Sequence, residues 1–139
     1  MALQICVPKE VRKDEQRVAL VPGIIKKLAQ NGLTVSIETH AGELVGYSDE
    51  EYEGATIVGS SVELLGKADI TLMVNPPNEE QVSQLKEGSV LIGYLNPYSE
   101  FERFEQLNAK RVSAFSVEMI PRISRAQAMD ALSSQASIA

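Results

Sequence analysis

The sequence predicts an α/β fold, an open parallel sheet with helices on both faces in a three-layer arrangement of the flavodoxin or Rossmann type. Short runs rich in β-branched residues alternate with stretches of helical apolar periodicity along the chain. Because crossovers between parallel strands are right-handed, such units place helices on both faces of one sheet. The 139 residues, 44% of them hydrophobic, suffice for one compact domain and are too few for two ordinary ones. We therefore expect a single domain over residues 1–139.

Five short apolar runs are expected to form the sheet. In chain order they are Leu3–Val7, Thr34–Thr39, Asp69–Val74, Ser89–Leu95 and Arg111–Phe115. The only cysteine, Cys6, lies in the first run and cannot form an internal disulfide. Its neighbours are apolar, so we expect Cys6 to be a small buried core residue and not a nucleophile.

The segments between these runs carry helix signals. The expected helices are Pro22–Asn31, Ser48–Tyr52, Ser60–Lys67, Asn78–Lys86 and Glu100–Asn108. Proline suits the first turn of the first helix, and Gly32 suits the left-handed position that ends it. Ser48 and Glu51 have the spacing of a capping box.

Charge and composition exclude several classes of function. The net charge of −6 and the pI of about 4.8 disfavour nucleic-acid binding. No stretch approaches the roughly 20 apolar residues that span a bilayer, and the N-terminus does not resemble a signal peptide, so we expect a soluble chain. His40 is the only histidine, which disfavours a metal site and a catalytic triad.

Ligands of such sheets bind beyond the carboxyl ends of the strands. Three polar segments follow predicted strands in this way: Pro8–Arg17, Asn75–Pro77 and Asn96–Tyr98. No G-x-G-x-x-G motif follows a strand, so this chain alone is not expected to bind a dinucleotide. The aromatic side chains expected to pack in the core or on helix faces, and not to stack on bases, are Tyr94, Phe101, Phe104 and Phe115.

A dense polar block spans residues 121–135 and would make a poor core. It holds Arg122, Arg125, Gln127 and Asp130 together with several serines. Polar groups that converge from a loop into a helix can hold an anionic or amide-bearing ligand. The plainer interpretation is a solvated ion cluster at the start of a helix.

The spacing Arg122-x4-Gln127-x2-Asp130 resembles the mobile loop of the NAD(H)-binding component of proton-translocating nicotinamide nucleotide transhydrogenases. Two further blocks resemble motifs that alanine dehydrogenases and transhydrogenases share. They are Pro8-Lys9-Glu10 followed by residues 17–22, and Ala41-Gly42 followed by residues 47–52. The resemblance covers the whole chain, and Ser137 departs from the asparagine usual in the family.

Three places separate the two enzymes of this family. One is the Arg122-x4-Gln127-x2-Asp130 spacing, which alanine dehydrogenases lack. Alanine dehydrogenases carry a substrate-binding lysine and a catalytic histidine where this chain has Asn75 and Asn96. A neutral amide supplies neither a cation for an oxo-acid carboxylate nor a proton for carbonyl reduction. Amino-acid oxidation is therefore not expected. Arg17 aligns with the substrate-binding arginine, and we expect it to pair with Glu10 or Asp14 or to brace the cleft.

The resemblance implies roles for the loop residues. Arg122 would donate to the amide oxygen of the nicotinamide, and Asp130 would accept from its nitrogen. Gln127 would reach toward the second nucleotide, and Ser133 would contact the dihydronicotinamide. None would act as an acid or base, because hydride passes directly between stacked rings and the protein supplies positioning.

The resemblance also implies cofactors and partners. NAD and NADP would be bound by a full assembly, mainly through other domains. The chain would be the N-terminal lobe of a two-lobe component, inactive by itself and lacking the Rossmann lobe that follows. Its partners would be that lobe, membrane-spanning and NADP(H)-binding components, and a second copy in a homodimer, on the cytoplasmic side of the inner membrane. Two alternatives stay open: a non-catalytic flavodoxin-like module that binds a ligand or partner, and an alanine dehydrogenase-like lobe.

Overall fold

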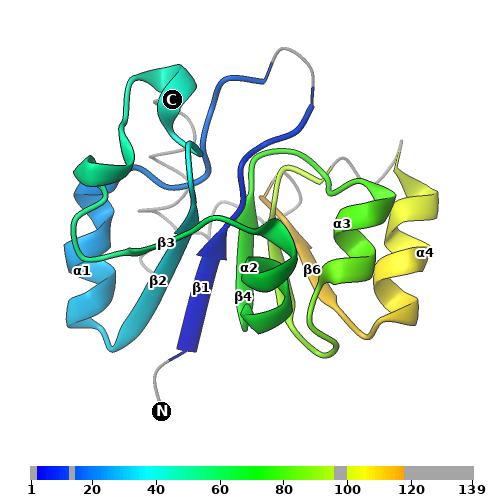
Figure 1. The fold of residues 1–139 in the computed structure, drawn as a ribbon. Coiled ribbons are helices and arrows are strands. Elements are labelled where there is room, and N and C mark those ends of the chain that lie inside the picture. The colour runs from blue at the N-terminus through cyan, green and yellow to red at the C-terminus, as the bar shows by residue number, and fades with distance from the viewer. Residues whose placement is uncertain (1–2, 13–14, 96–99, 118–139) are drawn as a thin grey trace.

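The computed structural model describes residues 3–12, 15–95 and 100–117. Within these residues six parallel strands form one sheet in the order β3-β2-β1-β4-β5-β6 (Figure 1). The strands are β1 Leu3–Val7, β2 Leu33–Glu38, β3 Thr56–Val58, β4 Ile70–Met73, β5 Val90–Gly93 and β6 Ser113–Ser116. The predicted class, an α/β fold with an open parallel sheet, is confirmed.

Helices cover both faces of the sheet, as expected. The α-helices are α1 Ile25–Gln30, α2 Ser61–Lys67, α3 Glu79–Gln84 and α4 Phe101–Ala109. The 3-10 turns are η1 Pro22–Ile24, η2 Glu43–Val45 and η3 Asp49–Glu51. Figure 1 shows α2, α3 and α4 side by side, and they share one core cluster with β4 and β5. Helix α1 packs on the opposite face, over β1 and β2.

Alternation along the strands divides the core between the two faces. Ile5 and Val7 of β1 belong to the cluster on the α1 side, where Ile25 is buried with them. Cys6, between them, points to the other face and packs with Val58 and Leu64. Period-two alternation is the geometry of a strand buried on both sides. The prediction that Cys6 is buried in the first strand is confirmed, since the residue is 0% exposed.

The strand β3 was missed by the sequence analysis, which predicted five strands. Thr56–Val58 is only three residues long, shorter than the runs that reveal a strand by pattern. It pairs with β2 at the edge of the sheet, and Val58 contributes to the core. Its conformation is therefore fixed by tertiary pairing, which the local sequence does not report.

The short helix predicted at Ser48–Tyr52 is a 3-10 turn, and the predicted capping box there is wrong. The Ser48 side chain makes no capping hydrogen bond. The Asp49 carboxylate instead accepts from Thr39 Oγ1 at 2.5 Å and from the His40 backbone N–H at 2.9 Å. The residue with the strongest acceptor therefore ties the turn to the end of β2.

The helix predicted at Asn78 does begin with a capping box. The backbone N–H of Gln81 donates to Asn78 Oδ1 at 2.7 Å, and the backbone N–H of Asn78 donates to Gln81 Oε1 at 2.9 Å. Gly32 adopts the expected left-handed conformation, with φ of 79°. Local capping and turn chemistry thus fixes the ends of α1 and α3.

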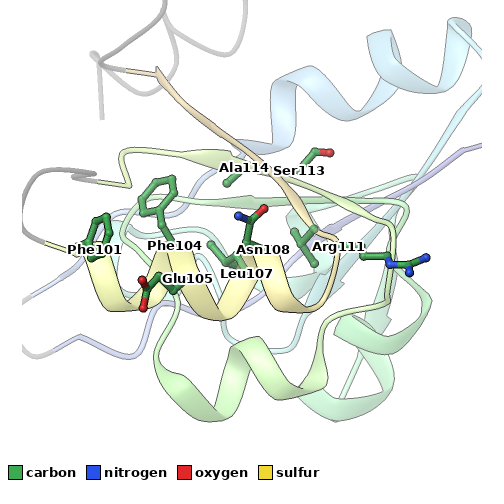
Figure 2. A pocket seen from close by; sticks show the side chains of 9 residues that line it. Phe101, Phe104, Glu105, Leu107, Asn108, Arg111, Ser113 and Ala114 are labelled. Atoms are coloured by element: carbon green, nitrogen blue, oxygen red, sulfur yellow. The ribbon is translucent and has the colours of Figure 1, made fainter.

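The expectation that the aromatic residues pack holds only in part. Phe104 packs against the core cluster beneath α4. Phe101 and Phe115 are 67% and 51% exposed, so for them the expectation was wrong. Figure 2 shows the hollow of about 540 Å³ that Phe101 and Phe104 line beside the edge strand β6. Its remaining lining residues are Glu105, Leu107, Asn108, Arg111, Val112, Ser113 and Ala114.

Gly93, the last residue of β5, is required by a close backbone approach. A Cβ atom at this position would lie 2.1 Å from the carbonyl oxygen of Met73 in the neighbouring strand β4. Because the obstacle is backbone, no side-chain rotation relieves it. We expect Gly93→Ala to lower the free energy of unfolding by about 2 kcal/mol, measured by urea denaturation. Gly59→Ala, where nothing lies within 4 Å, is the matched control and should change it by less than about 1 kcal/mol. Equal effects of the two substitutions would contradict this account.

Cys6 should be inert in the folded protein. Burial raises the pKa of its thiol to about 11, so the reactive thiolate is scarce as well as inaccessible. A stoichiometric disulfide reagent should therefore label the protein only after urea unfolds it, as followed by absorbance. Rapid labelling of the native protein would show that β1 is not a buried central strand.

Candidate functional site

The candidate site lies where the strand order reverses, between β1 and β4. From β1 the chain proceeds to β2 on one side, and it later returns to place β4 on the other side. In open α/β sheets ligands bind in the crevice beyond the carboxyl ends of the strands at such a point. The segments that follow β1 and β4 meet there, as the sequence analysis expected for Pro8–Arg17 and Asn75–Pro77.

Glu10 joins these two segments. Its carboxylate accepts hydrogen bonds from the backbone N–H groups of Val74 at 2.8 Å and of Asn75 at 3.1 Å. The residue is only 9% exposed. Burial raises the pKa of Glu10 to about 7, outweighing the two hydrogen bonds, which act to lower it. The nearby negative charge of Glu15 also raises this pKa, and Arg17 lowers it.

Glu15 holds Arg17 and Asn75 together. Its Oε2 accepts from Arg17 Nε and from the Arg17 backbone N–H, both at 2.9 Å. Its Oε1 accepts from Arg17 Nη2 at 2.9 Å and from Asn75 Nδ2 at 2.6 Å. The bidentate guanidinium is the main cause that lowers the pKa of Glu15 to about 2. Glu15 is therefore ionised at neutral pH.

The partner predicted for Arg17 is corrected by this geometry. Arg17 was expected to pair with Glu10 or Asp14, and it pairs with Glu15. Both oxygens of Glu10 are committed to the backbone after β4, and Glu15 presents the two-oxygen edge that a guanidinium matches. Asp14 lies outside the described residues. The expectation that Arg17 braces the cleft stays a prediction.

A small apolar hollow of about 40 Å³ lies at the same carboxyl ends, next to the segment held by Glu10. Its lining residues are Ala19, Leu72, Met73, Val74, Ile92, Gly93, Tyr94 and Val117. Val74 lines the hollow and also donates its N–H to Glu10, so the polar cluster and the apolar surface adjoin. The hollow is too small to enclose a ring, and its described residues offer no nucleophile paired with a base.

The residues predicted to orient a nicotinamide, Arg122, Gln127, Asp130 and Ser133, lie outside the described residues, as does Asn96. Their assignment stays a prediction. Asn75 is described, and its amide is engaged by Glu15.

Sequence reasoning missed Glu15 and gave Glu10 only as a possible ion-pair partner. A carboxylate placed three residues after a buried strand was the available signal for Glu10. Glu15 lies two residues from Arg17, but its link to Asn75 joins residues 60 apart and has no local signal.

Other features of the described residues carry less chemistry. His40 Nδ1 contacts Glu43 at 2.6 Å on an exposed turn, a local contact consistent with the expected structural role. Across 3–12, 15–95 and 100–117, no group of three or more metal-ligating side chains is placed to hold an ion. Nor does any helix in these ranges have the length and apolarity needed to cross a bilayer.

Residues 6–139 match a family model described as the N-terminal domain of alanine dehydrogenase/PNT. The chain belongs to this family. The resemblance inferred from Pro8-Lys9-Glu10 and the later blocks is thereby confirmed. Within the family, the subunit alpha of the NAD(P) transhydrogenase of Haemophilus influenzae is 36% identical over 135 residues, covering 96% of this chain and 26% of that protein.

Relatives come from both enzymes. The NAD(P) transhydrogenase subunit alpha of Cereibacter sphaeroides is 38% identical, covering 99% of this chain and 27% of that protein. The alanine dehydrogenase of Bacillus subtilis is 36% identical, covering 84% of this chain and 31% of that protein. The chain thus spans between about a quarter and a third of the length of these relatives.

Solved structures of both kinds of enzyme have a domain with the same fold as this chain. The transhydrogenase of Sinorhizobium meliloti superposes with a TM-score of 0.84 at 34% identity, over 94% of this chain and 40% of that one. An L-alanine dehydrogenase gives 0.78 at 31% identity, over 82% of this chain and 32% of that one. The family alone therefore does not decide between the two activities.

Glu10 should make the stability of the protein fall as pH rises. Its folded pKa, about 7, lies above the ordinary value of 4.5, so unfolding releases a proton between these values. The stabilisation is complete below pH 4.5 and lost as pH rises through 7. Relative to Glu10→Gln, the wild-type free energy of unfolding should fall by about 2.5 kcal/mol between pH 5 and pH 8.

Urea denaturation of both proteins at several pH values measures this difference. Glu15 acts in a separate window, because its lowered pKa affects stability only as pH falls from 4.5 toward 2. A wild type and variant that stay parallel from pH 5 to pH 8 would show that Glu10 ionises as freely as in the unfolded chain.

Proposed function

We propose that the chain is the N-terminal lobe of the NAD(H)-binding component of an NAD(P) transhydrogenase. Its loop around Arg122 and Asp130 would orient the nicotinamide for hydride transfer from NADH to NADP⁺. In the full assembly this transfer would be coupled to proton translocation through partner subunits. The lobe would lie at the cytoplasmic face of the membrane, held there by those partners, and would act in a homodimeric component.

The observation that carries this proposal is the state of Asn75. Its side-chain amide donates to Glu15, and Arg17 is bound to both oxygens of the same carboxylate. The described end of β4 therefore presents no unpaired cation to hold the carboxylate of an oxo acid. This favours transhydrogenation over amino-acid oxidation, the other activity found among the relatives.

The described residues of the cleft do not fit a pyrophosphate. Glu10 and Glu15 place carboxylates after β1, where a phosphate-binding turn needs glycines and free backbone N–H groups. The dinucleotide phosphates are thus assigned to a following lobe. What this lobe contributes is a contact with the nicotinamide end, made by the loop residues Arg122, Gln127, Asp130 and Ser133.

The sequence motif supports the roles of these residues. A guanidinium and a carboxylate can bind the two ends of a carboxamide, which offers one acceptor and two donors. Hydride would pass directly between the two rings, so the loop would supply orientation and exclusion of water, not a proton. Gln127 would reach toward the second nucleotide and help to bring the two nicotinamide rings together.

Arg122→Ala tests the proposal. In the complete transhydrogenase assembly it should slow hydride transfer at least tenfold, which corresponds to about 1.4 kcal/mol of lost transition-state positioning. In this chain alone the same substitution should change the free energy of unfolding by less than about 1 kcal/mol. Stopped-flow absorbance of the nicotinamide and urea denaturation measure the two effects.

Arg125→Ala is the matched control, because it removes a cation from the same segment at a position outside the Arg-x4-Gln-x2-Asp spacing. It should leave the rate within a factor of two or so of wild type. Unchanged hydride transfer in Arg122→Ala, or steady L-alanine-dependent formation of NADH by the wild-type assembly, would refute the proposed function.

A further inference from the structure

Asn75 is held at two points by two different carboxylates. Its backbone N–H donates to Glu10 at 3.1 Å, and its side-chain amide donates to Glu15 at 2.6 Å. Both carboxylates belong to the segment after β1, whereas Asn75 is the second residue after β4. Hydrogen bonds to two carboxylates therefore hold Asn75 in place where the two segments of the cleft meet.

The two carboxylates are not equivalent. Glu15 accepts two hydrogen bonds from the guanidinium of Arg17, whose positive charge neutralises the carboxylate. Glu10 accepts from two backbone N–H donors and is almost fully buried. An ionised carboxyl accepts both N–H groups, one on each oxygen, whereas a protonated carboxyl turns one oxygen into a hydroxyl donor. Protonation must therefore weaken one of the two bonds to the end of β4.

We propose that Glu10 is a proton-operated clamp that holds the segment after β4 when ionised and releases one of its two bonds when protonated. The clamp determines how firmly the backbone of Val74 and Asn75 is held, and thereby where Asn75 lies in the cleft. This proposal does not depend on the proposed function, since it concerns a contact within the lobe.

Burial of Glu10 is the main factor that sets the pH range in which the clamp operates, and the neighbouring charges adjust it. On its own segment, Glu15 repels the ionised form and Arg17 attracts it. Tyr94, in the segment after β5, helps to raise the pKa of Arg17 and so favours its charged form. The end of β4 contributes the N–H groups of Val74 and Asn75 and no charge. Glu15 and Arg17 keep their charges from pH 5 to pH 9, so Glu10 is the group in this cluster that changes, with its pKa near 7.

Nuclear magnetic resonance of the ¹⁵N-labelled chain tests the clamp. Between pH 5 and pH 9 the amide shifts of Val74 and Asn75 should titrate together, with a midpoint near 7. The amide proton of at least one of the two residues should move upfield as Glu10 is protonated, because the hydrogen bond that it donates becomes weaker. In Glu10→Gln both the titration and this upfield movement should disappear.

Glu38→Gln is the matched control. Glu38 also accepts from a backbone N–H, that of Lys9 at 2.8 Å, but at the end of β2. This variant should retain the titration of Val74 and Asn75. An absence of inflection in the wild type, or the same inflection in Glu10→Gln, overturns the proposal. Should Glu10→Gln fail to fold, the ¹³C shift of the Glu10 carboxyl in the wild type decides, and a midpoint near 4.5 would overturn the clamp.

Discussion

The hydrogen bonds from the end of β4 to the Glu10 carboxylate are the contact on which the cleft depends. Strands β1 and β4 are neighbours in the sheet although more than 60 residues separate them in the chain. Ladder hydrogen bonds join the strands themselves but end where the strands end. Beyond that point the side chains of Glu10 and Glu15 bridge the two segments. The cleft has a defined wall because this bridge exists.

The electrostatics of the cleft follow from the same constraint. Both oxygens of Glu10 accept hydrogen bonds from the backbone. The Arg17 guanidinium therefore pairs with Glu15, and Glu15 also accepts a hydrogen bond from the Asn75 amide. The positive charge of Arg17 is thereby neutralised by the Glu15 carboxylate. Such a wall is suited to hold a neutral or weakly polar group in position and unsuited to attract a small anion. The adjoining apolar hollow, bordered by Val74 and Tyr94, adds a dry surface of the same kind.

The fold could be predicted from the sequence where local chemistry decides the structure. The parallel α/β class, the burial of Cys6 and the helix that begins after Asn78 all follow from alternation and helix signals that a few neighbouring residues carry. The prediction failed where distant contacts decide. Strand β3 exists because β2 pairs with it, and Asp49, not Ser48, ties the turn before it. The same limit applies to the site, because the link from Glu15 to Asn75 joins residues that no sequence pattern relates.

The buried carboxyl of Glu10 also bears on how this lobe can change by mutation. Glutamine has nearly the same shape, is reached from glutamate by a single nucleotide change, and does not ionise. At neutral pH the carboxylate works against folding, and natural proteins lie only slightly above the stability that they need. Glutamine, however, has one acceptor oxygen where the carboxylate has two, so its amide nitrogen would face one of the two backbone N–H donors. Residue 10 is therefore constrained from two sides, because the charge opposes burial while the two N–H groups require two acceptor oxygens.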